Sequence, residues 1–190
     1  MTLYHQFGSK RELLEALFDD LGARNLVCHF GEVFEAPDAL EALSRLIKLF
    51  ARFWTAERLV IRRINAQAAV DPIFAESLAG RDERRRQGLT HILGRVAGET
   101  GKPAKRDLEE AIRVVFTLTS FQTFDSLAGA DRTPEEVAAT IHQLVLAAIG
   151  VAPTAKKRAE ALACPMLRTN AGAIAPNLGA SVGAVHAPSA

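Results

Sequence analysis

Apolar residues recur at every third or fourth position along most of the chain up to about residue 150. This spacing puts them on one face of an α-helix, whereas the alternation that is typical of a half-buried β-strand is scarce. The pattern therefore predicts an all-α fold. The expected elements are a helix over residues 10–29, one that begins after Asp38, one from Glu57 onward, a short amphipathic piece around Ile73 and Leu78, a charged helix over residues 82–99, and two long helices over residues 105–128 and 134–150.

Polar residues mark where several of these helices begin. Ser9 followed by Glu12 matches a capping box, in which each residue caps a free backbone N–H group of the other. The segment Thr133–Glu136 holds an N-cap threonine, a first-turn proline and a third-position glutamate in their favoured order. The pair Asp71–Pro72 indicates a turn or a helix start, and Gly31 and Pro37 are expected to mark a break after the first helix.

The last two helices predict an interface between copies of the chain. The second half of the helix over residues 105–128 is apolar on most of its faces, so it must be covered nearly all round. Two long apolar helices that close a domain favour a homodimer, in which residues 105–128 and 134–150 of two copies form a four-helix bundle. The alternative is that both helices are central core helices of one chain.

Composition and net charge limit the classes of protein to which the chain can belong. The 190 residues are 48% hydrophobic and 24% charged, which predicts a packed globular core, and the formal net charge is +1. A charge so close to zero does not mark a nucleic-acid binder, although a small basic face can be hidden within a balanced total. Cys28 and Cys164 are too far apart in sequence for a disulfide framework or a zinc site, so a cytoplasmic location is expected. No apolar run approaches the roughly 18 residues of a membrane span.

The amino-acid composition of the sequence changes after Gly150. Residues 151–190 are rich in alanine and proline, and they contain one acidic residue, Glu160, and no aromatic residue. Such a segment lacks the apolar content that would offset the entropy of ordering it, so disorder is expected over residues 151–190. Two origins stay open for this tail: a disordered extension of the protein, or a shifted reading frame.

The first residues predict a short helix with two contrasting faces. On a helical wheel the apolar face holds Leu3 and Phe7, the opposite face holds Thr2, His5 and Gln6, and Tyr4 lies on the flank. A short helix with a row of polar tips suits the major groove of DNA, where side chains contact base edges and phosphates. Lys10 lies in the first turn of the next helix, which is a suitable place for a phosphate contact.

The string "TLYHQFGSKRELL" resembles the end of the helix-turn-helix of TetR-family transcriptional regulators, at the recognition helix and the start of the linking helix. The resemblance covers about fourteen residues. It implies a homodimeric DNA-binding repressor that a small-molecule effector releases from its operator. Residues 1–30 would be the remnant of the DNA-binding domain, and residues 31–150 would form the helical effector-binding and dimerisation domain.

The resemblance also implies roles for individual residues. Tyr4 and Lys10 would contact phosphate, Thr2 and His5 phosphate or base edges, and Gln6 a base edge. The two helices that precede the recognition helix in that family do not precede Met1 in this sequence. The hypotheses are a truncated start, so that the operator is bound only when the N-terminus is completed, or a remnant that acts as a helical dimer or ligand sensor without DNA binding.

Effector pockets in helical regulators lie between helices and combine apolar walls with a few polar groups. The candidates are Phe50, Trp54, Asn65, Phe74, His91, Phe121, Gln122 and Asp125, of which Asn65, Gln122 and Asp125 lie on apolar segments. The preferred ligand-binding set is Trp54, Asn65, Phe121, Gln122 and Asp125. The alternative is that the aromatic residues are plain core and that the polar residues make hydrogen bonds between helices, while His91 is expected at the surface.

No motif indicates an enzyme. The string "GETGKP" over residues 98–103 lacks the first glycine of a phosphate loop and the hydroxyl residue after its lysine. No catalytic residues, metal ligands or cofactor are expected, because the five histidines do not pair at metal-ligand spacing. The run "RDERRR" over residues 81–86 is interpreted as a solvated helix face, since acidic residues interrupt its basic ones.

Overall fold

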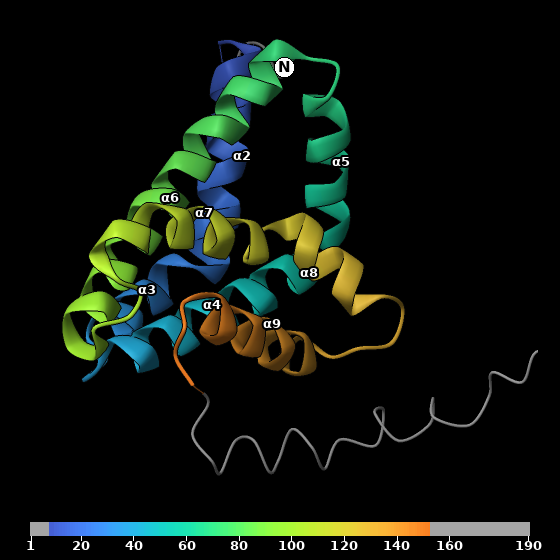
Figure 1. Cartoon of the computed structure of the whole chain (residues 1–190). Helices are drawn as coiled ribbons and strands as arrows, with labels where there is room; N and C mark the ends of the chain where they lie inside the picture. The colour runs from blue at the N-terminus through green and yellow to red at the C-terminus, as the bar shows by residue number, and fades with distance from the viewer. Residues whose placement is uncertain (1–7, 153–190) are drawn as a thin grey trace, which may run out of the picture. The chain divides into compact units, whose positions relative to one another are not determined.

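The computed structural model describes residues 8–152 of the chain, apart from the side chains of Asn25, Val27 and Cys28. Within this part all regular structure is helical, which confirms the predicted all-α class (Figure 1). The elements are α2 (Lys10–Asn25), α3 (Val27–Phe34), α4 (Ala39–Ala56), α5 (Arg58–Ala68), α6 (Pro72–Thr100), the 3-10 turn η1 (Lys105–Asp107), α7 (Leu108–Leu118), α8 (Phe121–Ala128) and α9 (Pro134–Ala148).

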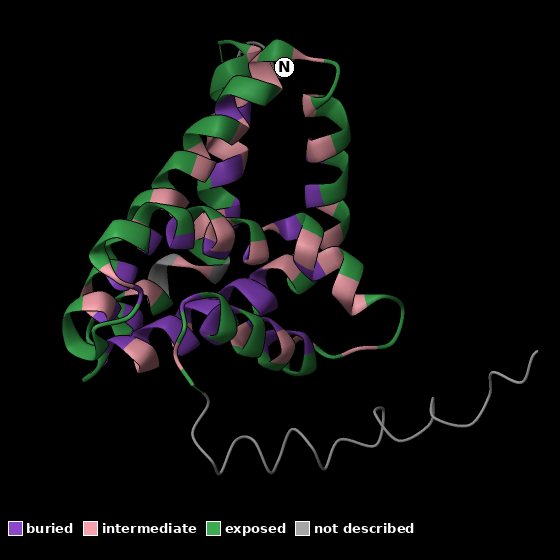
Figure 2. Ribbon diagram, viewed as in Figure 1, coloured by how far each residue is buried: buried purple, intermediate pink, exposed green. Residues whose placement is uncertain are grey.

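Helix α4 is the centre of the packing. Asp38 caps its start, because the carboxylate accepts a hydrogen bond of 2.7 Å from the backbone N–H of Glu41. Leu43 and Ile47 are fully buried along its length, and Figure 2 shows buried positions gathered on this helix. Helices α3, α5, α6, α8 and α9 all pack against α4. Helix α4 is therefore the central helix, and five other helices pack against it.

Helix α9 begins as the sequence predicts. The Thr133 hydroxyl accepts from the backbone N–H of Glu136, and the Glu136 carboxylate accepts from the backbone N–H of Thr133, so the capping box is complete. Val137, Ile141 and Val145 are buried at the helical spacing, where α9 packs against α4 and α7. At Ser9 the hydroxyl likewise accepts from the backbone N–H of Glu12, which confirms the predicted N-cap of α2.

The helix predicted over residues 10–29 is divided in two. Of the two residues predicted to mark the following break, Pro37 lies between α3 and α4, whereas Gly31 lies inside α3. Helix α2 ends at Asn25, and α3 continues through Gly31 to Phe34. Glycine costs a helix about 1 kcal/mol relative to alanine. The burial of Val33, which is 2% exposed, and the packing of Phe30 against the core outweigh that cost.

Residues 72–100 form one helix, rather than a short piece and a separate charged helix. The Asp71 carboxylate caps α6 by accepting a hydrogen bond of 3.0 Å from the backbone N–H of Ile73. Ser77 near its start and Leu89, Ile92, Leu93 and Val96 in its second half are buried, and Leu78 packs against the core, so tertiary packing supports the helix on both sides of its glycines. It ends where Gly101 adopts a left-handed conformation with φ of 69°.

The predicted helix over residues 105–128 is divided into η1, α7 and α8. The break lies at Thr119 and Ser120. The Thr119 hydroxyl donates to the Val115 carbonyl at 2.8 Å, and Ser120 caps α8 by accepting from the backbone N–H of Thr123 at 3.3 Å. Hydroxyl side chains that bond nearby backbone groups in this way compete with helix continuation. The break turns Phe121 and Phe124 into the interior, where both are buried.

Several predictions fall on residues outside this described part. They are the DNA contacts assigned to Thr2, Tyr4, His5 and Gln6, and nearly all of the tail over residues 151–190. None of the helices within residues 8–152 is both long enough and apolar enough to cross a bilayer.

Candidate ligand pocket

A pocket of about 420 Å³ lies between the helices, within the range of about 300–1,000 Å³ that is usual for small-molecule sites. Its walls come from α2, α4, α5, α6 and α8, with residues from and next to α3. Its lining is mostly apolar and aromatic. The lining residues are Phe18, Leu21, Gly22, Leu26, Phe30, Phe34, Leu46, Phe50, Phe53, Trp54, Ile61, Asn65, Leu78, Arg81, Asp82, Arg84, Arg85, Gly88, Phe121 and Gln122.

An aromatic wall forms one side of the pocket. The ring of Trp54 stacks on Phe50 at a centroid distance of 5.8 Å and meets Phe121 edge-on at 5.7 Å. The indole Nε1–H donates to the Thr119 carbonyl at 3.3 Å, which holds the ring in place. This bond joins α4 to the turn between α7 and α8. Such a wall offers a flat, rigid surface to an apolar ligand.

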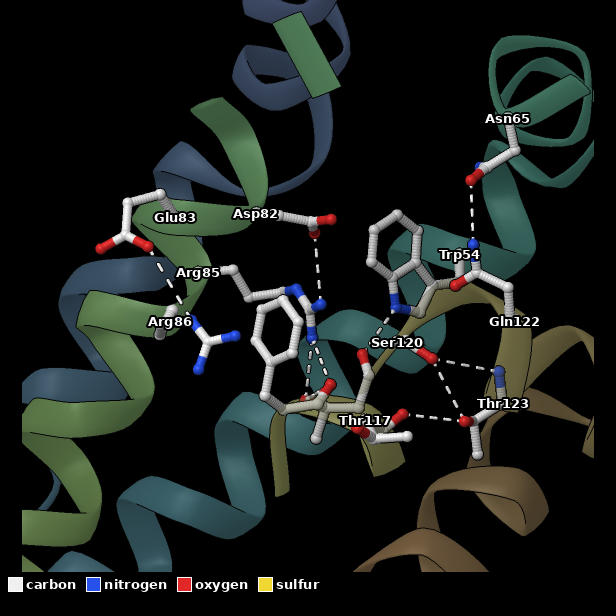
Figure 3. A network of polar contacts seen from close by, with 12 residues as sticks. Trp54, Asn65, Asp82, Glu83, Arg85, Arg86, Thr117, Ser120, Gln122 and Thr123 are labelled. Carbon is white, nitrogen blue, oxygen red and sulfur yellow. Dashed lines mark hydrogen bonds and ion pairs between the residues drawn. The ribbon is translucent and has the colours of Figure 1, made fainter. Parts of the chain in front are cut away.

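A buried arginine lies on the α6 side of the pocket. The side chain of Arg85 is 7% exposed, and its guanidinium carbon lies 3.7 Å from the ring centroid of Phe116. Nη1 donates to the Phe116 carbonyl at 2.8 Å and to the Thr119 hydroxyl at 3.1 Å, while Nη2 donates to Asp82 at 3.2 Å (Figure 3). Burial lowers the pKa of Arg85 below the ordinary arginine value, against the opposing effect of Asp82.

The Nε–H group of Arg85 has no hydrogen-bond partner among the described residues. A buried guanidinium whose donors are partly unused is costly, so the site favours an acceptor. The interpretation of residues 81–86 as a solvated face is therefore wrong at Arg85. It holds for Glu83 and Arg84, which are exposed.

Arg81 lies one turn before Arg85 and joins the pocket to α2. Its side chain is 22% exposed and donates to Glu15 at 2.5 Å and to Asp19 at 2.8 Å. The guanidinium also lies 5.3 Å from the ring centroid of Phe18, another lining residue of α2. Helices α2 and α6 are thus held together at the pocket by ion pairs and a cation–π contact.

Four of the five preferred ligand-binding residues meet at this pocket. Trp54, Asn65, Phe121 and Gln122 all line it. The Gln122 side chain donates to the Asn65 side chain at 2.9 Å, so these two residues also make the hydrogen bond between helices that the sequence left as an alternative. In Figure 3 this pair and Arg85 lie on either side of Trp54. Of the other candidates, Phe50 lines the pocket and the exposed His91 does not.

The fifth residue, Asp125, does not line the pocket. Its carboxylate accepts from Arg58 at 2.5 Å and, in a bidentate pair, from Arg62 at 2.9 Å to each oxygen. It lies instead beside a cavity of about 30 Å³, which has room for a water molecule. Burial alone would raise the pKa of Asp125, but hydrogen bonds from Arg62 and Arg58 outweigh it and lower the pKa. Asp125 therefore serves as a clamp between α5 and α8.

Lys10, the predicted phosphate contact, is ion-paired within the chain. Its ammonium group binds the Asp71 carboxylate at the start of α6 and lies 5.1 Å from the ring centroid of Phe74. The hydrogen bond from Lys10 is the main reason that the pKa of Asp71 is lowered. The side chain of Lys10 remains 41% exposed.

Arg81 and Arg85 line the pocket but were not predicted to do so, although the sequence holds a signal for Arg85. Leu78, Arg85 and Ile92 are seven residues apart, so they lie on one face of a continuous helix. Ile92 is fully buried and Leu78 packs against the core. An arginine on such an apolar stripe is a candidate for a buried polar site. This register exists only if residues 72–100 form one continuous helix, whereas the sequence predicted two.

Within residues 8–152, no group of three or more His, Cys, Asp or Glu side chains is arranged to hold a metal ion. Comparisons of the chain with protein-family models, with curated proteins and with solved structures found no match.

Proposed function

We propose that the chain is a homodimeric transcriptional regulator of the TetR type, in which an effector bound in the pocket weakens binding to operator DNA. The observation that carries this proposal is the position of α2. This helix begins at Lys10, directly after the stretch that resembles a recognition helix, and its residues Phe18, Leu21 and Gly22 line the pocket. The helix next to the proposed DNA-contacting residues is therefore also a wall of the pocket.

The contacts of α2 supply a route for coupling. Arg81 of α6 is ion-paired with Glu15 and Asp19 of α2, and Lys10 of α2 is ion-paired with Asp71, the residue that caps α6. A ligand that binds between these helices and prefers one spacing of them shifts the population toward that spacing. The coupling is reciprocal, because an operator that prefers another spacing weakens ligand binding by the same factor. Repression would be relieved when ligand binding moves α2.

In this proposal Tyr4 and Lys10 contact phosphates, Thr2 and His5 contact phosphates or base edges, and Gln6 reads a base. Two copies of the chain present these residues to two half-sites. A dimer with two-fold symmetry requires an operator with matching near-palindromic symmetry.

Selection from a random double-stranded DNA library tests the function. The protein isolated from its native cells is expected to enrich a near-palindromic sequence and to bind it at least about a thousandfold more tightly than a scrambled duplex. Fluorescence anisotropy at fixed salt measures both affinities. The regulator would be refuted if no sequence were enriched, or if the most enriched duplex bound no more tightly than the scrambled one.

The salt dependence of the same binding tests Lys10. Lys10→Gln is expected to reduce the slope of log K against log[salt] by about one, because one phosphate contact is lost. The matched control is Asp71→Asn, which breaks the same ion pair from its other side and keeps a residue that can cap α6. This control is expected to leave the slope unchanged. An equal loss in both variants would show that the ion pair supports the fold and that Lys10 does not contact DNA.

A second candidate function is a ligand-binding helical dimer that does not bind DNA. The favouring observation is that, within the described part of the chain, the residues that line the pocket all lie between Phe18 and Gln122. Ligand binding without DNA enrichment would select this candidate over the regulator.

A further inference from the structure

The pocket combines hydrocarbon and aromatic walls with an excess of positive charge. Among the described lining residues, three are arginines, Arg81, Arg84 and Arg85, and one, Asp82, is acidic. Two acidic side chains of α2 engage Arg81, whereas the Asp82 carboxylate that faces Arg85 is 48% exposed. Arg84 is exposed to water, so Arg85 is the least compensated of the buried charges in the described lining.

The donors of Arg85 define a place for a head group. Its Nη1 is held by the Phe116 carbonyl and the Thr119 hydroxyl, which fixes the plane of the guanidinium. The Nε–H has no described partner, and Nη2 has only the exposed Asp82. Nε and Nη2 lie on one edge of the guanidinium. In proteins such an edge can bind a carboxylate through two parallel hydrogen bonds.

The surroundings define the body of the ligand. Trp54 and Phe50 are stacked, Phe121 meets Trp54 edge-on, and Leu78 of α6 contributes aliphatic surface. Gly22 and Gly88 also line the pocket, and a Cβ atom built at either glycine would meet no heavy atom within 4 Å. Both glycines thus leave room between the helices for a hydrocarbon chain or ring.

We propose that the effector is a hydrophobic carboxylate whose acid group binds Nε and Nη2 of Arg85, in place of Asp82, while its hydrocarbon body packs on the aromatic wall. This inference rests on the proposed function, because it takes the pocket as the effector site. The contacts of Arg85 also connect the ligand to the rest of the fold. Arg85 and Trp54 both bind Thr119, so a ligand between them bears directly on the turn between α7 and α8.

Trp54 provides a direct readout, because it is the chain's only tryptophan and lines the pocket. Its fluorescence is titrated with decanoate, 1-decanol and decyltrimethylammonium, which share one hydrocarbon chain and differ in charge. Decanoate is expected to bind at least about tenfold more tightly than 1-decanol, as hydrogen bonds to a charged group suggest. Lengthening octanoate to decanoate is expected to tighten binding about fourfold per methylene. A preference for the alcohol or the ammonium compound would overturn the proposal.

Variants locate the head group. Arg85→Gln is expected to weaken decanoate binding at least about tenfold and to leave 1-decanol binding nearly unchanged. Arg85→Lys should restore part of the preference for decanoate, and Asp82→Asn should strengthen it. The matched control is Arg86→Gln, because Arg86 is the next residue on α6 and does not line the pocket. Equal loss of both ligands in Arg85→Gln, or equal loss of decanoate in Arg86→Gln, would overturn the assignment to Arg85.

A steric variant keeps the proposal testable if Arg85→Gln does not fold, which circular dichroism shows. Gly88→Leu adds a side chain to the pocket without changing any charge, and it is expected to abolish binding of decanoate and 1-decanol alike. Retained binding of decanoate at full affinity in this variant would place the ligand elsewhere.

The titrations contain no DNA, so the two proposals fail separately. Preferential binding of decanoate without selection of any DNA sequence would refute the regulator and support the carboxylate pocket. Selection of an operator, together with a preference for the neutral alcohol, would support the regulator and refute the ligand class.

Discussion

Asp125 of α8 accepts hydrogen bonds from Arg58 and Arg62, two side chains one turn apart on α5. The carboxylate is 20% exposed, so its charge is partly removed from water and depends on both arginines. The clamp holds α5 against α8, and each of these helices supplies pocket residues, including Ile61 and Phe121. A polar residue on an apolar helix thus shapes the pocket without entering it.

We expect Asp125→Asn to lower the free energy of unfolding at neutral pH by about 1–3 kcal/mol, because two guanidinium groups lose their charged acceptor. The lowered pKa of Asp125 makes its contribution to stability complete above the ordinary aspartate pKa of about 3.9, and the contribution is lost as the pH falls below it. The wild type should therefore lose more stability than Asp125→Asn between about pH 6 and pH 3.

Urea unfolding followed by circular dichroism measures both effects. Asp131→Asn is the control, since Asp131 is exposed in the turn after α8. Equal acid sensitivity of the wild type and Asp125→Asn would contradict the role of the clamp.

The helix starts that sequence identifies are those with a complete local signal. Thr133 and Glu136 cap each other, and the hydrogen bond from the backbone N–H of Thr133 is the first cause of the lowered pKa of Glu136. The break between α7 and α8 also carries a local signal, the hydroxyls of Thr119 and Ser120. An apolar pattern that continues across residues 114–124 concealed that break.

Thr133→Ala is expected to lower the free energy of unfolding by about 1 kcal/mol, since the first turn of α9 loses its cap. The matched control is Thr90→Ala, the same substitution at an exposed position within α6. Alanine has the higher helix propensity, so this control is expected to be neutral or slightly stabilising. Chemical denaturation of both variants under one set of conditions compares them, and a smaller loss in Thr133→Ala than in the control would refute the capping argument.

At the scale of the whole molecule, the proposed dimer assigns a role to the outer face of α9. Leu144 is 44% exposed on this helix, and Ala139, Gln143 and Ala147 are exposed beside it. The inner face of α9 is fully used by the core of one chain. The core and interface interpretations are therefore compatible, because opposite faces of the same helix serve them.

We expect the wild type to elute as a dimer in light-scattering chromatography and Leu144→Arg to shift toward the monomer. A charge placed within an apolar interface is removed from water and has no ion-pair partner. The free-energy penalty destabilises the dimer and leaves the monomer unaffected. Leu59→Arg is the matched control, because Leu59 is 67% exposed on α5, outside the proposed interface. A dimer that survives Leu144→Arg, or a wild type that is monomeric at all concentrations, would refute this interface.

Sequence alone predicted much of the pocket's aromatic wall, but not its charge. Trp54 and Phe121 stand out because bulky aromatic residues on apolar helical stripes are directed inward. Asn65 and Gln122 stand out because polar residues on such stripes need partners. Arg85 was overlooked because its neighbours in sequence are charged, and because its burial depends on Phe116, which lies 31 residues away.

The sequence by itself determined the all-α class, the caps of α2, α4 and α9, and the apolar stripes that form the core. These features depend on interactions within about four residues along the chain, so their signal is local. Only the tertiary structure decided that α6 runs unbroken past its glycines, that Asp125 binds two arginines of α5, and that Arg85 is buried in the pocket. Each of these outcomes depends on contacts between segments distant in sequence, whose packing energy exceeds the local preferences of the residues involved.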